Sequence, residues 1–118
     1  MKNKFKHALN GVMIGLVTDR SIRLHFVISL LVILMGMVLM LSATQWALLL
    51  LTISMVMVLE YVNSAIEVFA SHVHPEQHEA IKKTKDLAAA AVFLASICAF
   101  FIGIIIFLPP IFVILGKF

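Results

Sequence analysis

Three long runs of apolar residues dominate the chain, over residues 26–44, 46–70 and 87–108. A helix needs about 20 predominantly apolar residues to cross the hydrocarbon core of a bilayer. None of the runs shows the alternation of polar and apolar residues that is typical of a membrane β-strand. The pattern therefore predicts three transmembrane helices, with spans at about 26–44, 46–70 and 87–108.

The residues before the first run have a different pattern. The apolar residues that recur there at helical spacing are Phe5, Ala8, Leu9, Val12, Leu16 and Val17. Lysines occupy the other faces, so we expect an amphipathic helix over about 1–20 that lies on the membrane surface. Gly11 and Gly15 are four residues apart, which would let a neighbouring backbone approach closely. The alternative is that this spacing is accidental.

The amino-acid composition indicates that these apolar helices belong to a membrane protein. The 118 residues are 63% hydrophobic and only 13% charged, against about 45–50% and about 25% in soluble domains. A soluble fold of this size could not bury such a surplus. A soluble enzyme, a disordered chain and a disulfide scaffold are excluded, the last because Cys98 is the one cysteine. We expect residues 1–118 to form a single all-α, membrane-embedded domain.

The distribution of charge predicts an orientation. Of nine Lys and Arg residues, eight precede the first run or lie between the second and third, and the other is Lys117. Basic residues gather on the cytosolic side, so the N-terminus and the connection after the second run should be cytosolic. Pro109 and Pro110 should end the last helix. The basic excess is too small and dispersed to indicate nucleic-acid binding.

Two carboxylates lie inside the second apolar run, Glu60 and Glu67. An acidic side chain at the bilayer centre costs about 2.5–3.5 kcal/mol on insertion scales, so such residues usually face protein or water and have a function. Helical geometry places Asn63, Ser64 and Ser71 on the same stripe. The alternative is that these polar residues simply hold helices together.

The other charged and polar residues lie at a similar depth, just before the first and third runs. They are Asp19, Arg20, Arg23, Glu76, His78, Lys85 and Asp86. Such a set suits phosphoryl transfer, because Mg²⁺ takes carboxylate and phosphate oxygens, basic residues stabilise phosphates, and a further carboxylate can accept the proton of a hydroxyl. The glycine-rich phosphate-binding motif of soluble kinases is absent, and the histidines at 72, 74 and 78 do not form a convincing zinc motif.

Residues 60–67, Glu-Tyr-Val-Asn-Ser-Ala-Ile-Glu, resemble the E-x-x-N-[ST]-A-I-E motif of the prokaryotic diacylglycerol kinase family. Residues 76–78 resemble its E-Y-H element, and Lys85-Asp86 resembles its K-D pair. Residues 19–25, Asp-Arg-Ser-Ile-Arg-Leu-His, are similar to the E-R-N-F-R-I-H element of the Gram-positive branch, which is mostly undecaprenol kinase.

The resemblance implies a homotrimer with composite active sites between subunits, and it implies a role for each matching residue. Glu60 would be the catalytic base, Asp19 and Glu67 would hold Mg²⁺ with the phosphates of ATP, and Lys85 would contact those phosphates. The other nucleotide-binding residues would be Glu76, Gln77, His78 and Asp86. The residues that meet the lipid would be Arg23, Asn63 and Glu60.

The chain departs from the family pattern at three places. Asp19 replaces a glutamate, Gln77 replaces a tyrosine, and Ser71-His72 stands where the family usually has an aspartate followed by another residue. These changes shorten one candidate metal ligand, remove a ring near the nucleotide, and remove one carboxylate from the end of the stripe.

The sequence thus predicts an ATP- and Mg²⁺-dependent kinase of a membrane lipid alcohol, with undecaprenol as substrate on the strength of residues 19–25. One alternative is a diacylglycerol kinase that makes phosphatidic acid. An alternative of another class is a small proton-coupled multidrug transporter, although such proteins have four spans with the key glutamate in the first. A third is a catalytically silent assembly subunit.

Overall fold

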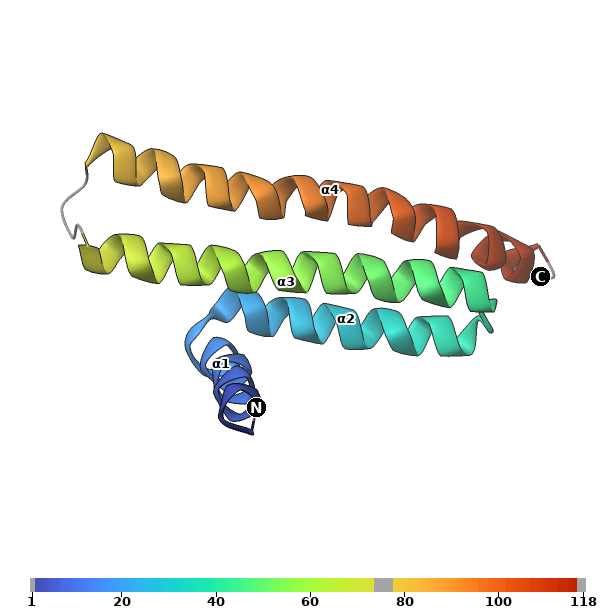
Figure 1. The fold of residues 1–118 in the computed structure, drawn as a ribbon. Helices are drawn as coiled ribbons and strands as arrows, with labels where there is room; N and C mark the ends of the chain where they lie inside the picture. The colour runs from blue at the N-terminus through green and yellow to red at the C-terminus, as the bar shows by residue number, and fades with distance from the viewer. Residues whose placement is uncertain (1, 74–77, 117–118) are drawn as a thin grey trace.

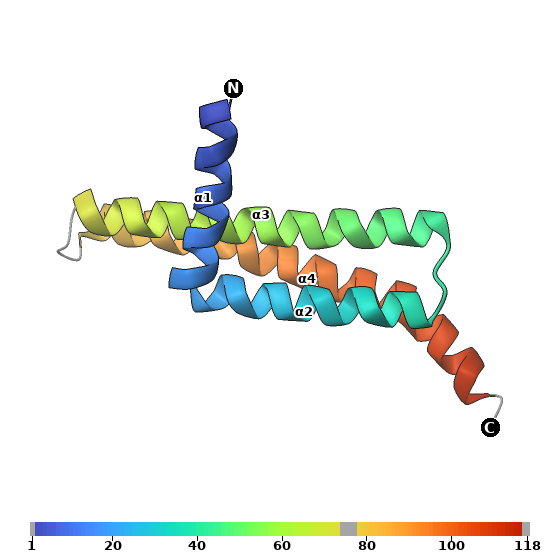
Figure 2. The ribbon, with the colours of Figure 1, turned by 90° about the horizontal axis from the view of Figure 1, so that it is seen from below.

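The computed structural model describes residues 2–73 and 78–116, which form four helices. They are α1 (Lys2–Thr18), α2 (Arg20–Val38), α3 (Ala43–Val73) and α4 (Glu79–Leu115). The last three run side by side, and α1 projects from this bundle at a steep angle (Figures 1 and 2). These three are long and apolar enough to cross a membrane. The predicted all-α fold is confirmed.

A single residue, Asp19, separates α1 from α2. Its backbone is extended, and its Oδ1 accepts hydrogen bonds from the backbone N–H groups of Ser21 (2.9 Å) and Ile22 (3.4 Å). This is the arrangement of an N-cap, which satisfies donors that have no partner within the helix. The cap makes α2 begin at Arg20, six residues before the predicted apolar run.

A short connection joins α2 to α3, and Met40 adopts a positive φ of 55° within it. The N–H of Ser42 donates to Oε1 of Gln45 (2.9 Å), and the N–H of Gln45 donates to Oγ of Ser42 (3.2 Å). This reciprocal pair is a capping box that starts α3 at Ala43. The predicted 26–44 span therefore differs from α2 at both ends, since the Asp19 cap starts α2 at Arg20 and the helix ends at Val38, before the capping box of α3.

The expectation that Pro109 and Pro110 end the last helix is wrong, because α4 continues through both prolines to Leu115. A proline removes one backbone donor and pushes against the preceding turn, which bends a helix without always ending it. Figure 2 shows the C-terminal part of α4 turning away from the bundle. At its other end, α4 begins at Glu79 after the N-cap His78.

The helices differ in length, and the difference positions the polar residues. At 1.5 Å per residue the 19 residues of α2 span about 28 Å, close to the hydrocarbon thickness of a bilayer, whereas the 31 residues of α3 span about 46 Å. Because α2 and α3 are joined by a short connection, α3 continues about 18 Å past the start of α2. There α3 runs beside α4 and no longer beside α2 (Figure 1). We call this part, residues 62–73 and 78–90, the hairpin extension.

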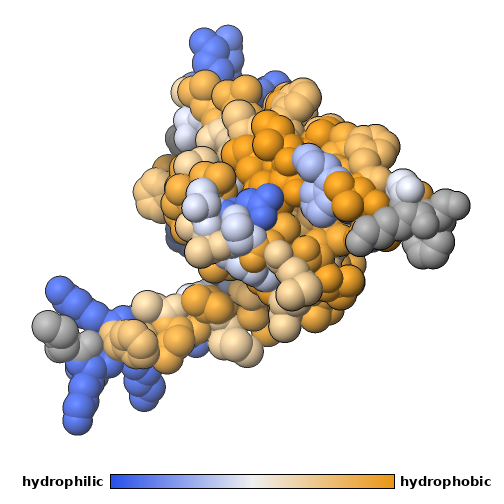
Figure 3. Space-filling model, turned by 90° about the vertical axis from the view of Figure 1, so that its right-hand side faces the viewer, coloured by the Kyte–Doolittle hydropathy of each residue, from blue (hydrophilic) through white to orange (hydrophobic). Residues whose placement is uncertain are grey.

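Most of the apolar surface is exposed, as a lipid-facing protein requires. A small buried cluster of Leu49, Ile106 and Phe107 packs near Trp46 at the end of the bundle opposite α1. Viewed from that end, the surface is predominantly hydrophobic, and hydrophilic residues gather at the tip of the projecting α1 (Figure 3). The bundle therefore has one largely apolar end and one end where the polar residues gather.

Candidate active site

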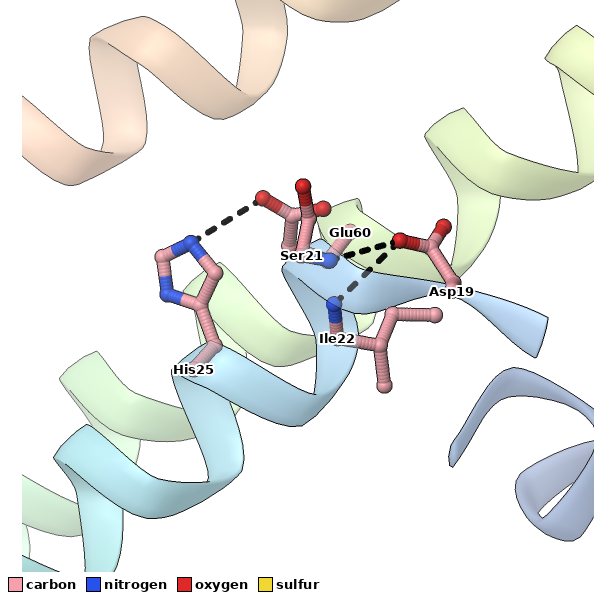
Figure 4. Close-up of polar contacts among 5 residues, drawn as sticks. All are labelled: Asp19, Ser21, Ile22, His25 and Glu60. Atoms are coloured by element: carbon pink, nitrogen blue, oxygen red, sulfur yellow. Dashed lines mark hydrogen bonds and ion pairs between the residues drawn. The ribbon is translucent and has the colours of Figure 1, made fainter. Parts of the chain in front are cut away.

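Glu60, on α3, is the one buried charged residue in the described part of the chain, with 5% of its surface exposed. Its Oε1 lies 3.1 Å from Nε2 of His25 on α2 (Figure 4). An isolated carboxylate is costly to remove from water, and a neighbouring imidazole offsets that cost. The structure thus confirms that Glu60 faces protein, and it supplies a partner that the sequence pattern did not reveal.

His25 also lines a cleft of about 330 Å³ between α2, α3 and α4. The polar residues that line it besides His25 are Ser29, Thr52 and Ser96, and the others are apolar. The partner of Glu60 therefore borders a largely apolar space among the three long helices.

Arg23 is engaged at the junction between α1 and α2. Its Nη1 donates to the backbone carbonyl oxygens of Leu16 (3.0 Å) and Val17 (2.8 Å), in the last turn of α1. A cation at a helix C-terminus satisfies free carbonyls and interacts favourably with the helix dipole. The structure therefore gives this predicted lipid-binding residue a part in fixing the angle between α1 and α2.

Tyr61, the neighbour of Glu60, holds α1 against α3. Its hydroxyl donates to the carbonyl oxygen of Val12 (2.8 Å), and its ring packs on Gly15, where an added Cβ would lie 2.8 Å from Tyr61 Cζ. The close approach predicted at Gly15 is therefore real, although a side chain makes it rather than a backbone. Gly11 has nothing within 4 Å.

A second concavity, of about 650 Å³, lies between α1 and α3. It is lined mainly by apolar residues, together with the polar residues Thr18, Tyr61, Ser64 and His72. The contacts of Arg23 and Tyr61 thus set the width of a groove beside the candidate site.

The hairpin extension carries the candidate nucleotide-binding residues. Nζ of Lys85 donates to Oγ of Ser71 (2.8 Å), which ties α4 to the polar stripe of α3. Glu67 is exposed one turn before Ser71, and Asn63 is half-buried. Ser71 therefore contacts the lysine without neutralising its charge.

Asp86, the other predicted nucleotide-binding residue of α4, forms an exposed ion pair with Lys82 (2.8 Å). Water and salt screen such an exposed pair, so Asp86 can exchange this partner for another at little cost in stability. His78 is exposed at the N-cap of α4. The predicted residues Glu76 and Gln77 lie outside the described residues.

The structure pairs two predicted site residues with partners outside the predicted set. Glu60 meets His25 near the start of α2, and Lys85 meets Ser71 in the hairpin extension. Among residues 2–73 and 78–116 there is no group of three or more His, Cys, Asp or Glu residues placed to hold a metal. The roles of His25, Tyr61 and Ser71 were missed because each depends on a contact between helices. Only the Gly11–Gly15 spacing signalled one of them.

The known proteins that are similar to this chain all belong to one class. The profile of the family described as prokaryotic diacylglycerol kinase matches residues 6–107. A diacylglycerol kinase of Synechocystis sp. is 40% identical over 108 residues, which cover 91% of this chain and 62% of that protein. An undecaprenol kinase of Bacillus subtilis is 32% identical over 107 residues (91% and 87%), and a diacylglycerol kinase of Escherichia coli is 30% identical over 93 residues (79% and 76%).

Three long apolar helices with a buried carboxylate, together with these similarities, place the chain among relatives of membrane lipid kinases. More particularly, the chain belongs to the prokaryotic diacylglycerol kinase family. The resemblance seen in residues 60–67 is thereby confirmed. Family membership favours a kinase over the transporter considered from the sequence. The chain spans 62% of the length of the Synechocystis protein.

Proposed function

We propose that this protein transfers the γ-phosphoryl group of ATP to the hydroxyl of a membrane lipid, with Glu60 as the general base. The observation that carries the proposal is a carboxylate that is buried and paired with His25, a residue that lines a cleft among the long helices. As the hydroxyl oxygen bonds to the γ-phosphorus, the bond from that phosphorus to the bridging oxygen of ADP breaks. Glu60 takes the hydroxyl proton.

Lys85 is proposed to bind the phosphates of ATP. An ammonium group has three N–H donors, and Ser71 accepts one of them. Because Ser71 is uncharged, the positive charge of Lys85 is available to the phosphates. Asp86 and His78, together with Glu76 and Gln77, are proposed to complete the nucleotide site.

Asp19 and Glu67 are proposed to hold Mg²⁺. Mg²⁺ usually takes one or two protein carboxylates and completes its shell with water and substrate phosphates, so a cluster of three protein ligands is not required. The cap of α2 uses Oδ1 of Asp19, which leaves Oδ2 for a ligand, and Glu67 is exposed. When bound, the ion would neutralise charge on the phosphates. The donor set therefore fits this ion.

The assembly and location belong to the same proposal. The exposed position of Glu67 suits a site that is completed by another subunit, as in the homotrimer that the family resemblance implies. Eight of the nine basic residues lie before the first apolar run or between the second and third. We place that end in the cytosol of a bacterium, at the cytoplasmic membrane, where ATP is available.

Undecaprenol is the lipid that we propose first, since residues 19–25 resemble the Gram-positive element and the Bacillus subtilis relative is an undecaprenol kinase. Diacylglycerol is the second candidate, favoured by the 40% identity to the Synechocystis diacylglycerol kinase. Asn63 is proposed to support Glu60 or the lipid hydroxyl, and any contact of Arg23 with lipid would use donors other than Nη1.

The experiment is a lipid kinase assay with the purified protein, ATP and Mg²⁺ against undecaprenol, diacylglycerol and ceramide in matched vesicles. Phosphorylation of undecaprenol should be fastest. Glu60→Gln should lower the rate by about 10²- to 10⁴-fold, the usual contribution of a general base. Glu79→Gln, at an exposed carboxylate on α4, is the matched control and should behave like the wild type. Absence of lipid-dependent ATP turnover would overturn the kinase proposal, and a fully active Glu60→Gln would overturn the assignment of the base.

A further inference from the structure

We propose that His25 is a positioning residue for Glu60, and that it holds one carboxylate oxygen so that the other accepts the proton of the lipid hydroxyl. This inference rests on the proposed function and adds a residue to it. Nε2 of His25 lies 3.1 Å from Oε1 of Glu60, and the Glu60 side chain is 7% exposed. In the described part of the chain, His25 is the one ion-pair partner of this buried carboxylate.

The fold fixes the position of His25 independently of Glu60. Ile22, one turn earlier on α2, is completely buried, and its backbone N–H is held by the Asp19 cap. Residues three apart lie on the same helix face, so the buried Ile22 directs this face, and with it His25, toward α3. Figure 4 shows the imidazole pointing from α2 to the carboxylate.

One member of the pair, His25, borders a cleft that a lipid could enter. His25 lines the cleft between α2, α3 and α4, most of whose lining is apolar. A carboxylate in such surroundings has two oxygens of equal basicity and can rotate about its terminal bond. A contact with Oε1 removes that freedom and leaves Oε2 as the acceptor. Preorganisation of this kind lowers the cost of reaching the reactive geometry.

In this mechanism His25 neither gains nor loses a proton. With a proton on Nε2, His25 keeps its contact with Oε1 throughout the transfer. The hydroxyl proton moves to Oε2 as the new oxygen–phosphorus bond forms and ADP leaves. Glu60 then returns this proton to water before the next cycle. His25 therefore affects the rate of the chemical step and not the binding of ATP.

The test compares two amides of different length at this position. The amide nitrogen of Gln in His25→Gln can occupy a place near that of Nε2, whereas Asn in His25→Asn is too short to reach Oε1. We expect His25→Asn to lower kcat about 10- to 100-fold, the usual effect of removing an orienting partner, with the KM for ATP unchanged. His25→Gln should keep most of the wild-type kcat. His7→Leu, at an exposed histidine of α1, should not change either constant.

Two outcomes would overturn the inference. The first is equal kcat in His25→Asn and the wild type. The second is a loss that persists in the Glu60→Gln background, where a residue that acts through Glu60 should have no further effect.

A measurement without turnover separates this inference from the proposed function. The ¹⁵N resonance of His25 Nε2, observed in protein with labelled histidine, should move in Glu60→Gln and stay in place in Glu79→Gln. An unmoved resonance would overturn the pairing. A moved resonance together with no phosphorylation of any lipid would overturn the proposed function and leave the pairing intact.

Discussion

At the scale of single residues, side chains with proposed chemical roles also hold the fold. Asp19, a proposed Mg²⁺ ligand, caps α2 through one oxygen, and Arg23 closes the last turn of α1. Lys85 is held by Ser71 across two helices. A loss of activity after substitution of these residues therefore does not by itself identify a chemical role, and variants that separate the two roles are needed.

Substitutions at Asp19 separate the cap from the metal. Asparagine is as good an N-cap as aspartate, so Asp19→Asn should keep the thermal stability of the wild type. Its loss of charge should raise the Mg²⁺ concentration needed for half-maximal activity at least about tenfold, the effect of about 1.4 kcal/mol in binding. Asp19→Ala should in addition lose about 0.5–2 kcal/mol of stability. Magnesium titrations of activity and thermal melts in detergent measure both effects. An unchanged magnesium dependence in Asp19→Asn would contradict the ligand role.

At the scale of elements, the position of α1 depends on two contacts. The carbonyl groups of its last turn bind Arg23 of α2, and its middle packs on Tyr61 of α3. The small surface of Gly15 permits the second contact. Tyr61 directly follows Glu60, so the position of α1 is coupled to that of the candidate base.

A methyl group at Gly15 should displace α1. Its Cβ would lie 2.8 Å from Tyr61 Cζ, so the ring must move and its hydrogen bond to Val12 must lengthen. We expect Gly15→Ala to destabilise the protein by about 1–3 kcal/mol, as overpacking usually does, and to lower lipid kinase activity. Thermal melts and the lipid assay measure both.

Gly11→Ala is the matched control, because nothing lies within 4 Å of the added Cβ. Alanine in the interior of a helix is about 0.5–1 kcal/mol more favourable than glycine, so this variant should be slightly more stable than the wild type. Equal stability of the two alanine variants would show that α1 does not rest on Tyr61.

At the scale of the whole molecule, the three long helices separate two ends of different chemistry. One end has the capping box and Trp46, and the other has the α1–α2 junction, the Glu60–His25 pair and the hairpin extension. The short α2 matches the thickness of the hydrocarbon core, so the polar part of α3 beyond it reaches the interface. A lipid hydroxyl and a soluble nucleotide can meet only at such a boundary.

The predicted orientation can be tested with single cysteines in a Cys98→Ala background. Thr44→Cys, at the start of α3, should react in intact cells with a maleimide that does not cross membranes. His7→Cys, on α1, should react only after the membrane is permeabilised. Wild-type Cys98, although exposed in the isolated chain, should stay unlabelled in the native membrane because it faces lipid. The reverse pattern for the two introduced cysteines would contradict a cytosolic active site.

The sequence by itself determined the membrane class, the three long helices, the polar stripe of α3 and the family. Hydropathy is sufficient for the first two, because lipid selects apolar residues along the whole exposed length of a helix. The spacing of Glu60, Asn63 and Glu67 is sufficient for the stripe, since helical geometry alone places these residues on one face. The Ser42–Gln45 capping box is also a local sequence pattern and could have been predicted, but hydropathy alone does not reveal it within the apolar residues around it.

Only the tertiary structure decided which of these residues touch. The pairing of Glu60 with His25, the packing of Tyr61 on Gly15, and the contact of Lys85 with Ser71 each join two different helices. The relative height and rotation of the helices fix such contacts, and these depend on how side chains pack rather than on the pattern within one helix. The continuation of α4 past Pro109 and Pro110 is a further case, because a proline weakens a helix locally while its surroundings decide whether the helix bends or ends.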